Sequence, residues 1–278
     1  MKRILGLAIV AALVGCSDKH AGHTSADSSH QHAGPDPKAD DPHAGHHASA
    51  DGAMMMVRTE PAQPKAADKI VVKLMIHDAA GAMLKDFEVF HEHKVHLILV
   101  RDGLDQFAHV HPEIEAAGNM TVTHTFPVGG TYRLYADYKP AGKPAATARA
   151  EVRVSGAAPE KPAIVPNAAG RIQADGLQAA VKIDGAKAGA DGRIEFTLTD
   201  TADKPLMDLQ PYMGAMGHLV VISADGKDYV HSHPASGKTA TNEIAFEVHF
   251  GKAGIYKGWG QFLRDGKVRI VPFVFQVN

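Results

Sequence analysis

The amino-acid sequence predicts an all-β protein made of two tandem β-sandwich domains of immunoglobulin-like or cupredoxin-like type. Three observations lead to this fold class. Short runs of β-branched and aromatic residues recur along the chain, and Gly, Pro, Asn or Asp separates most of them. No segment keeps a helical period. A stretch of the first half also recurs in the second half, which is typical of a duplicated domain.

The N-terminal segment predicts export and lipidation. A basic pair, Lys2-Arg3, precedes an apolar run from Ile4 to Val14, which is too short to span a bilayer. The run ends in Leu13-Val14-Gly15-Cys16, which resembles a bacterial lipobox. We therefore expect a lipoprotein signal peptide over residues 1–15 and lipidation of Cys16, with an ordinary secretory signal as the alternative. In a Gram-negative host, Ser17 after the lipidated Cys favours an outer-membrane anchor facing the periplasm.

Composition narrows the functions that the folded part could have. Cys16 is the only cysteine, so the domains contain no disulfide, no thiolate metal site and no thiol nucleophile. The formal net charge of −2 argues against a nucleic-acid partner. Residues 16–67 consist mostly of Ala, Gly, Asp, Ser, Pro and His, and they predict a disordered, His-rich tether. The chain has 18 His and one Trp, so the positions of the histidines decide the interpretation.

The strands are expected in two groups separated by a Pro-containing linker over residues 155–170. The first group lies in a domain over residues 68–154, and the second lies in a domain over residues 171–278. The expected strands of the first domain are Ile70–Ile76, Val95–Val100, Gln106–His111, Met120–Phe126, Thr131–Tyr138 and Ala146–Val154. Those of the second are Leu177–Ile183, Ile194–Thr199, Gly217–Ser223, Asp228–His233, Ile244–Phe250, Ile255–Leu263 and Val268–Val277.

The internal repeat selects six of the histidines. At an offset of 122 residues, Asp86 to Pro112 aligns without a gap on Asp208 to Pro234, and each copy ends in a His-x-His-Pro motif. The other histidines of the folded region have no His counterpart in the alignment. The positions that hold His in both copies are His96, His109 and His111 in the first, and His218, His231 and His233 in the second.

Strand geometry predicts that each set of three converges. A hairpin closed by residues 101–106 would place Val100 opposite Phe107 and His96 opposite His111, with His109 on the same face. The same register places His218 against His233, with His231 beside them. Three converging imidazoles suit Cu(II), Zn(II) or Ni(II). The alternative is that these histidines are hydrogen-bonded structural residues.

Further candidate ligands flank each set. Met213 and Met216 precede the second set, and thioethers select Cu(I), although both Met side chains could instead fill core gaps. His91 and His93 extend the first set into a cluster that is richer in imidazole. Trp259 and the aligned Tyr135 are expected to be core aromatics. Seven more histidines in the tether, between residues 20 and 47, predict weak capture of metal ions.

The chain also resembles a known family. At Gly214-Ala215-Met216-Gly217-His218, His231-Ser232-His233-Pro234 and Gly254 to Phe262 it is similar to a largely uncharacterised bacterial family with Gly-His…His-x-His-Pro domains. Its members are exported or lipid-anchored and are often described as heavy-metal-binding. The resemblance covers roughly residues 70–278. It implies a periplasmic role in handling metal, most plausibly copper. This chain lacks the Cys-containing metal-binding segment found in some relatives.

The sequence thus predicts a periplasmic, lipid-anchored transition-metal-binding protein that captures, buffers or delivers metal. Copper is favoured, with zinc and nickel as alternatives. The expected partners are metal ions, the membrane and a metal-transport or resistance protein. The alternative function is a non-enzymatic, immunoglobulin-like structural or interaction module of the cell envelope. A metal-dependent enzyme with three histidine ligands is the least favoured class, because the only carboxylates that both repeats share near the histidines are Asp86 and Asp208, ten residues upstream.

Overall fold

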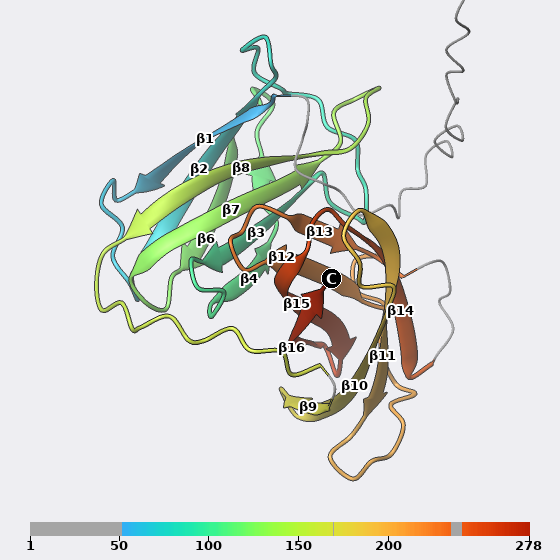
Figure 1. The fold of residues 1–278 in the computed structure, drawn as a ribbon. Coiled ribbons are helices and arrows are strands. Elements are labelled where there is room, and N and C mark those ends of the chain that lie inside the picture. The colour runs from blue at the N-terminus through green and yellow to red at the C-terminus, as the bar shows by residue number, and fades with distance from the viewer. Residues whose placement is uncertain (1–51, 169, 235–240) are drawn as a thin grey trace, which may run out of the picture. The chain divides into compact units, whose positions relative to one another are not determined.

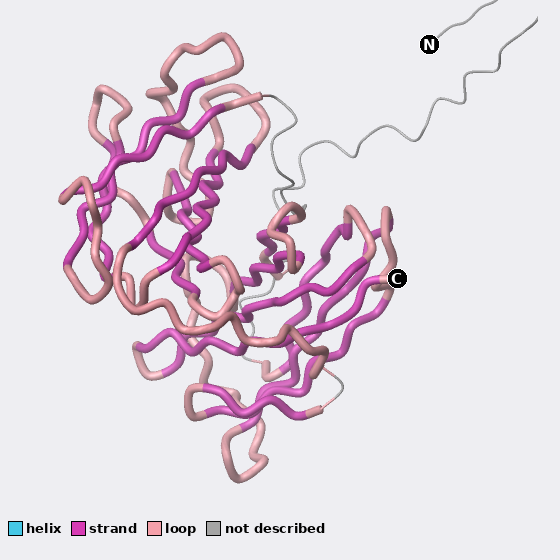
Figure 2. Tube along the Cα trace, turned by 60° about the vertical axis from the view of Figure 1, so that its left-hand side comes forward, coloured by secondary structure: helices cyan, strands magenta, loops and turns pink. Residues whose placement is uncertain are grey.

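A computed structural model describes residues 52–168, 170–234 and 241–278, and these residues all belong to one compact unit. They form strands, turns and loops, as Figure 2 shows, with no helix among them. Accordingly, the described ranges contain no helix with the length and apolar character needed to cross a bilayer. The predicted all-β fold class is confirmed, with four four-stranded sheets arranged in two repeated halves.

The first half is a sandwich of two antiparallel sheets (Figure 1). Its outer sheet has the order β1-β2-β6-β5, and the strands are β1 (Met54–Glu60), β2 (Lys69–His77), β6 (Met120–Thr125) and β5 (Glu113–Ile114). The facing sheet has the order β4-β3-β7-β8, and the strands are β4 (Phe107–Val110), β3 (Val95–Arg101), β7 (Gly130–Tyr138) and β8 (Ala146–Val154).

The second half repeats this arrangement. One sheet has the order β14-β11-β10-β9, formed by β14 (Glu243–Phe250), β11 (Ala190–Thr199), β10 (Leu177–Asp184) and β9 (Arg171–Ala174). The other has the order β13-β12-β15-β16, formed by β13 (Tyr229–Ser232), β12 (His218–Ser223), β15 (Gly254–Arg264) and β16 (Lys267–Val277). Strands β3, β4, β7 and β8 of the first half thus correspond to β12, β13, β15 and β16 of the second.

Alternation along the strands builds the core of each sandwich. In β2, Ile70, Val72, Leu74 and Ile76 all point to the same side and are buried, while the residues between them are exposed or half-buried. Full burial of one such side chain contributes about 1.5–3 kcal/mol. Phe196, Phe246 and Phe273 have the same role in the core of the second half.

The two central strands are buried on both faces. Every residue of β3 and of β12 is buried, so these strands do not alternate between core and solvent. Leu97 and Leu99 point into the core of their own sandwich, whereas Ile98 and Val100 belong to a third cluster. Val220, Ile222 and Trp259 of the second half belong to that same cluster. The sheets that contain β3 and β12 therefore pack against each other, and the two sandwiches share a third apolar core.

Aromatic stacking across this shared core is reciprocal. Phe107 stacks on Trp259 with ring centroids 4.8 Å apart, and Tyr135 stacks on Tyr229 with ring centroids 4.5 Å apart. In the repeat alignment Phe107 matches Tyr229, and Tyr135 matches Trp259. Each half thus contributes the same pair of positions to the contact. The expectation that Tyr135 and Trp259 are core aromatics holds, but their core is the one between the halves.

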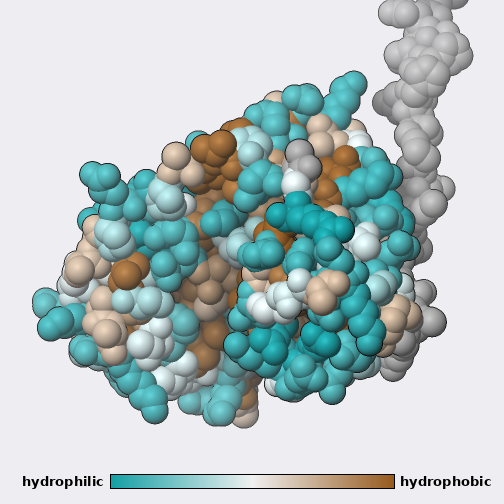
Figure 3. All heavy atoms as spheres, turned by 90° about the horizontal axis from the view of Figure 1, so that it is seen from below, coloured by the Kyte–Doolittle hydropathy of each residue, from teal (hydrophilic) through white to brown (hydrophobic). Residues whose placement is uncertain are grey.

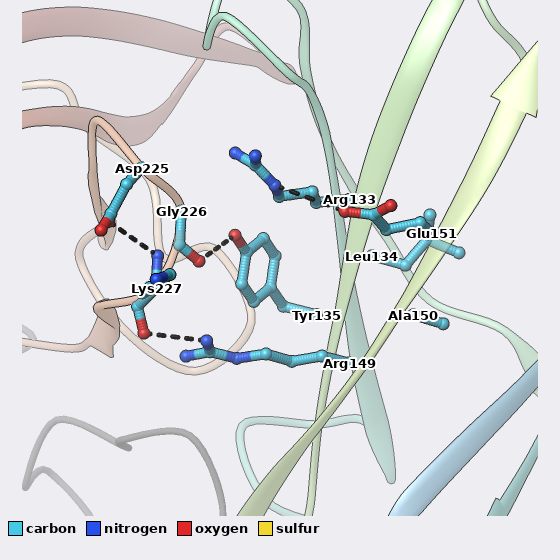
Figure 4. Close-up of a pocket in the computed structure, with 9 residues that line it drawn as sticks. All are labelled: Arg133, Leu134, Tyr135, Arg149, Ala150, Glu151, Asp225, Gly226 and Lys227. Atoms are coloured by element: carbon cyan, nitrogen blue, oxygen red, sulfur yellow. Dashed lines mark hydrogen bonds and ion pairs between the residues drawn. The ribbon is translucent and has the colours of Figure 1, made fainter.

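Polar contacts lie at the rim of the shared core. Figure 4 shows the Tyr135 hydroxyl donating to the Gly226 carbonyl and Arg149 donating to the Lys227 carbonyl, both at 2.8 Å. These residues line a hollow of about 400 Å³ whose walls come from both halves. The face in Figure 3 is covered mainly by hydrophilic residues, with hydrophobic residues gathered in the middle of the view.

The predicted hairpin register is confirmed in both halves. Val100 pairs with Phe107 and Ile98 pairs with His109 in the first half, and Val220 pairs with His231 in the second. Continued by one pair, each ladder places His96 opposite His111 and His218 opposite His233. All imidazoles of each set therefore lie on the same face of their sheet, the face that packs against the other half.

The predicted boundary of the first domain was wrong. Met54–Glu60, assigned to the disordered tether, form β1 and pair with β2 from Met54↔His77 to Glu60↔Val71. Strand β1 gains this ladder and buries Met55, which offsets the conformational entropy of ordering the segment. The short strands β5 and β9 were not predicted. The proposed signal peptide, Cys16 and the seven tether histidines lie outside the described residues.

Candidate metal centre

Two groups of three histidines converge in the described residues, and they are the two predicted sets. We call His96, His109 and His111 the first triad, and His218, His231 and His233 the second triad. Within each triad, one nitrogen from each ring lies within 4.8 Å of the other two. Strand β3 or β12 supplies the first histidine of each triad. The other two come from β4 or β13 and the residues directly after it.

Hydrogen bonds fix which nitrogen carries the proton in two of the first-triad rings, His96 and His109. His96 Nε2 donates to the Phe90 carbonyl at 3.1 Å, so the Nδ1 of a neutral His96 has no hydrogen. His109 Nδ1 donates to Gln261 Oε1 at 3.0 Å, which leaves His109 Nε2 bare. His96 Nδ1 lies 3.1 Å from His109 Nε2 and 3.2 Å from His111 Nε2. The lone pairs of His96 Nδ1 and His109 Nε2 thus face each other at the centre of the triad, where a cation would stabilise them.

The second triad repeats the outer hydrogen bonds of the first. His218 Nε2 donates to the Tyr212 carbonyl at 2.8 Å, and His231 Nδ1 donates to Asp137 Oδ2 at 2.8 Å. The remaining nitrogens are His218 Nδ1, His231 Nε2 and His233 Nε2. All three are buried and have no hydrogen-bond partner among the described residues. A buried polar atom without a partner is costly, so three such atoms aimed at one point indicate a ligand.

In each triad, one histidine is held by a hydrogen bond to a side chain of the opposite half. Gln261 on β15 holds His109 of the first half, and Asp137 on β7 holds His231 of the second half. Asp137 and Gln261 occupy equivalent positions, because Asp137 pairs with His96 across β3 and β7 as Gln261 pairs with His218 across β12 and β15. One triad is thus supported by a neutral amide, and the other by a carboxylate.

Asp137 is fully buried and surrounded by donors. Its Oδ1 accepts a hydrogen bond from Thr147 Oγ1 at 2.6 Å, and its Oδ2 accepts hydrogen bonds from the Tyr229 hydroxyl and from His231. Burial, with the Asp137 charge beside it, raises the pKa of Tyr229 well above its usual value, so the hydroxyl keeps its proton and donates.

Burial keeps most of the triad imidazoles neutral. Burial, with a smaller contribution from neighbouring imidazoles, lowers the pKa of His96 to about 2 and that of His111 to about 3. Burial also lowers the pKa values of His109, His218 and His233 well below the usual value, and His231 contributes electrostatically to each of these shifts. A neutral imidazole is the form that ligates a metal, so these side chains are in the ligating state at neutral pH.

The two triads lie next to each other between the sheets. The ring centroids of His109 and His231 are 5.0 Å apart, and those of His96 and His231 are 5.5 Å apart. His109 and His218 are separated by 5.8 Å, and His96 and His218 by 6.4 Å. Each half therefore presents its histidines directly to the histidines of the other.

His91 and His93 lie around the triads rather than within them. The His91 ring stacks on His233 of the other half with centroids 3.5 Å apart, and the His93 ring stacks on His111 at 3.8 Å. His91 and Glu92 both have positive φ, at 50° and 67°, in a tight turn bridged by Phe90 and His93. Such backbone angles are uncommon for residues with a side chain and recur at functional sites.

The predicted methionine ligands are both buried. Met216 packs in the hydrophobic core of the second sandwich, so the alternative interpretation of this residue as a core filler holds. Met213 occupies the turn position equivalent to His91, and it has a similar positive φ of 48°. The Met213–Gly214 turn thus corresponds to the His91–Glu92 turn.

Sequence reasoning missed Asp137 and Gln261. The candidate histidines are positions that hold the same residue type in both halves, whereas these two equivalent positions hold different residues. A signal was present, because each is a polar residue between non-polar neighbours near the end of a long strand: Asp137 is flanked by Ala136 and Tyr138, and Gln261 by Gly260 and Phe262. Polar residues at such buried positions need partners, and here the partners are triad histidines.

Comparisons with known proteins identify the repeated domain. One family model, described as Domain of unknown function (DUF8832), matches the chain over residues 48–156 and again over residues 172–278. This match supports the predicted duplication, and the description of the family mentions neither a metal nor a lipid anchor. No curated protein sequence matches the chain.

Solved structures with a similar arrangement include two bacterial surface proteins. The Escherichia coli adhesin FdeC is 16% identical with a TM-score of 0.28, and the alignment covers 83% of this chain and 65% of the adhesin. Invasin, a bacterial integrin-binding protein, is 13% identical with a TM-score of 0.23, over 80% of this chain and 39% of invasin. Red sea bream transglutaminase is 12% identical with a TM-score of 0.23, over 82% of this chain and 31% of the enzyme. The chain thus spans less than two thirds of the length of each.

Proposed function

The chain belongs to the family Domain of unknown function (DUF8832) through both of its halves, and we propose that this pair of domains binds transition-metal ions, with copper favoured. The observation that carries the proposal is the convergence of one nitrogen from each ring in both triads, with the three nitrogens of the second triad buried and without a hydrogen-bond partner among the described residues. A tetrahedral ion bound at about 2.0–2.1 Å would hold its ligand nitrogens roughly 3.3 Å apart. The 3.1 and 3.2 Å separations in the first triad fit such an ion with little adjustment.

The surroundings of the triads support binding rather than catalysis. A hydrolytic site needs a carboxylate or another base that is available to a metal-bound water. The carboxylate nearest to the second triad, Asp137, already accepts hydrogen bonds from Thr147, Tyr229 and His231. It therefore orients a ligand and is not available as a base. Capture, buffering or delivery of metal fits this arrangement, and a metal-transport or resistance protein would be the partner in delivery.

A metal titration tests this function. The seven tether histidines are first replaced by Ser, so that the chain keeps its length while the tether loses its own ligands. This chain is titrated with Cu(I), Cu(II), Zn(II) and Ni(II), alone and with His109→Ala/His111→Ala or His231→Ala/His233→Ala. We expect tight binding of copper that each double substitution reduces by one ion. His124→Ala, on the outer strand β6, is the matched control and should leave binding unchanged.

Binding that survives in a chain lacking both triads would contradict the proposal. In that case the alternative function gains support, namely a non-enzymatic interaction module of the cell envelope that works without metal. An interaction module should keep its activity when His109 and His111 are replaced.

We place the protein at the bacterial cell envelope, anchored through lipid on Cys16. The lipobox-like sequence Leu13-Val14-Gly15-Cys16 supports this location. Labelled palmitate should be incorporated into the chain and lost in Cys16→Ser. Recovery of the unsubstituted chain entirely in the soluble fraction would contradict the anchor while leaving metal binding untouched.

A further inference from the structure

We infer that the two triads form one dinuclear centre shared by the halves, rather than two independent sites. The inference rests on the proposed function, because it concerns how the bound ions are placed. It starts from the position of the histidines on facing sheets. Strands β3 and β12 each carry one histidine on the face that packs against the other half, and the hairpin partners β4 and β13 add the rest.

The distances between rings limit the separation of the two ions. An ion bound at about 2.0–2.1 Å from a ring nitrogen lies about 3 Å from the centroid of that ring. The centroids of His109 and His231, one from each triad, are 5.0 Å apart. Adding about 3 Å at each end gives an upper limit of roughly 11 Å between the two ions. The two ions would therefore lie close enough to interact directly.

Neither triad is complete without the other half. His109 of the first triad depends on Gln261 for its orientation, and His231 of the second triad depends on Asp137. Groups that fix the tautomer and direction of a ligating imidazole typically change metal affinity 10–100-fold. Each triad therefore depends on the fold of the opposite half for the orientation of one of its histidines.

The two ion positions are unequal. Asp137 places a buried negative charge against a ligand of the second triad, whereas Gln261 places a neutral amide at the equivalent position. A carboxylate behind a histidine raises its strength as a ligand and offsets part of the charge of the ion. The second triad therefore takes the first ion. Repulsion between two dications at about 11 Å then weakens the second binding step about tenfold, even at the dielectric constant of water.

Electron paramagnetic resonance of Cu(II) distinguishes a dinuclear centre from separate sites. The chain with Ser at the seven tether histidines is loaded with one and then two equivalents of Cu(II) at low salt. We expect a resolved spectrum at one equivalent, and at two equivalents a spectrum broadened by dipolar coupling, with a half-field transition. The control uses no substitution in the triads: one equivalent of Cu(II) followed by one of Zn(II) should restore the narrow spectrum.

The other outcomes overturn either the dinuclear centre alone or the proposed function as well. Two bound Cu(II) ions whose spectrum is the sum of two uncoupled signals would overturn the dinuclear centre and leave the proposed function in place. One ion per chain, lost in His109→Ala/His111→Ala and also in His231→Ala/His233→Ala, would likewise overturn it in favour of a single shared ion. Failure to bind Cu(II), Cu(I), Zn(II) or Ni(II) more tightly than a chain without the triads would overturn the proposed function as well.

Discussion

At the scale of single residues, Asp137 and Gln261 determine how the two triads differ. They are equivalent in position, both are buried, and each contacts the Nδ1 of a histidine from the other half. A carboxylate there makes the imidazole a stronger ligand, whereas an amide only fixes its direction. The difference between the two metal positions therefore depends on one charge.

Replacing that charge should weaken the tighter site. We expect Asp137→Asn to lower the affinity for the first copper ion about 10–100-fold, because the amide keeps the hydrogen bond to His231 but loses the negative charge. Competition with a chelator of known affinity measures the change. Tyr229→Phe is the matched control, since it removes a different partner of Asp137 and keeps the aromatic ring. Equal losses in both variants would contradict a specific role for the charge.

The buried histidines should make the metal-free protein sensitive to acid. The folded-state pKa of His96 is lowered to about 2 by burial, whereas an unfolded chain titrates near 6.5. As the pH falls below about 6.5, the unfolded chain takes up this proton first, so the stability present above 6.5 decreases until the pH reaches about 2. The loss is about 1.4 kcal/mol per pH unit for one fully buried histidine.

Urea denaturation of the metal-free chain between pH 7.5 and 5 measures this slope. His96→Gln should reduce the dependence of the unfolding free energy on pH, because the unfolded chain then no longer takes up a proton at this position. His249→Gln is the control, since this histidine is only half-buried and pairs with Asp191 in the other sheet of the second half. A free energy of unfolding that stays constant over this pH range would contradict the buried, neutral state of the triads.

At the scale of elements, the two turns beside the triads have the same shape but different residues. The first turn has His91 and Glu92 at positive φ, and the second has Met213 and Gly214. Glycine adopts such angles without strain, whereas a residue with a Cβ atom pays about 1 kcal/mol. The first turn therefore holds strain that the second avoids at one position.

Adding a Cβ atom in the second turn and removing one in the first should have opposite effects on the free energy of unfolding. Gly214→Ala is expected to lower the free energy of unfolding by about 1 kcal/mol through its φ of 76° alone. A Cβ there meets no atom closer than 3.6 Å, so crowding adds nothing. Glu92→Gly should raise the free energy of unfolding by roughly 0.5 kcal/mol after the entropy of the unfolded chain is counted. Chemical denaturation compares both, and changes of the same sign would contradict the explanation.

The sequence predicted most strands and both hairpin registers, because β-branched runs and turn lengths are local signals. It did not predict β1, whose Met54-Met55-Met56 run lies in a stretch of Ala, Pro and Asp and gains its order only by pairing with β2. The packing of one sandwich on the other was also missed. The continuous apolar runs of β3 and β12 carried that information, since a strand buried on both faces does not alternate.

The triads were predictable for the same reason, since a repeat and a side-chain period of two place three histidines together within one half. That the two triads meet could not be predicted from these signals. It depends on which faces of the two sandwiches pack together, and no local pattern encodes the partner of a sheet. The hydrogen bonds of Asp137 and Gln261 to the histidines span the same contact between the halves, so the roles of these two residues were not predicted either.

At the scale of the whole molecule, the shared core makes the two halves one folding unit. Separation would expose Val220, Ile222 and Tyr229 together with Ile98 and Tyr135, all of them buried. Neither half can lose its fold without uncovering the apolar face of the other. Metal bound between the halves would strengthen this dependence, because it binds only the folded pair.

The only tryptophan of the chain reports on this contact directly. Trp259 stacks on Phe107 in the shared core, so its fluorescence follows the separation of the halves. We expect the fluorescence and far-ultraviolet circular dichroism curves to coincide in urea, as in a single cooperative transition. Phe107→Leu should shift both midpoints together. A fluorescence change that precedes the loss of strand signal would show that the halves part before they unfold.

The reciprocal contacts between the halves resemble those of a symmetric dimer, but the two halves can differ in sequence. Two identical subunits paired about a two-fold axis must carry the same residue at both equivalent positions. Because gene duplication has placed both subunits in one polypeptide, each copy can mutate alone. The first half has Asp137 where the second has Gln261, and His91 where the second has Met213. A homodimer could not contain such differences between its subunits. Fusion of two copies therefore turns a symmetric scaffold into one that can treat two ions differently.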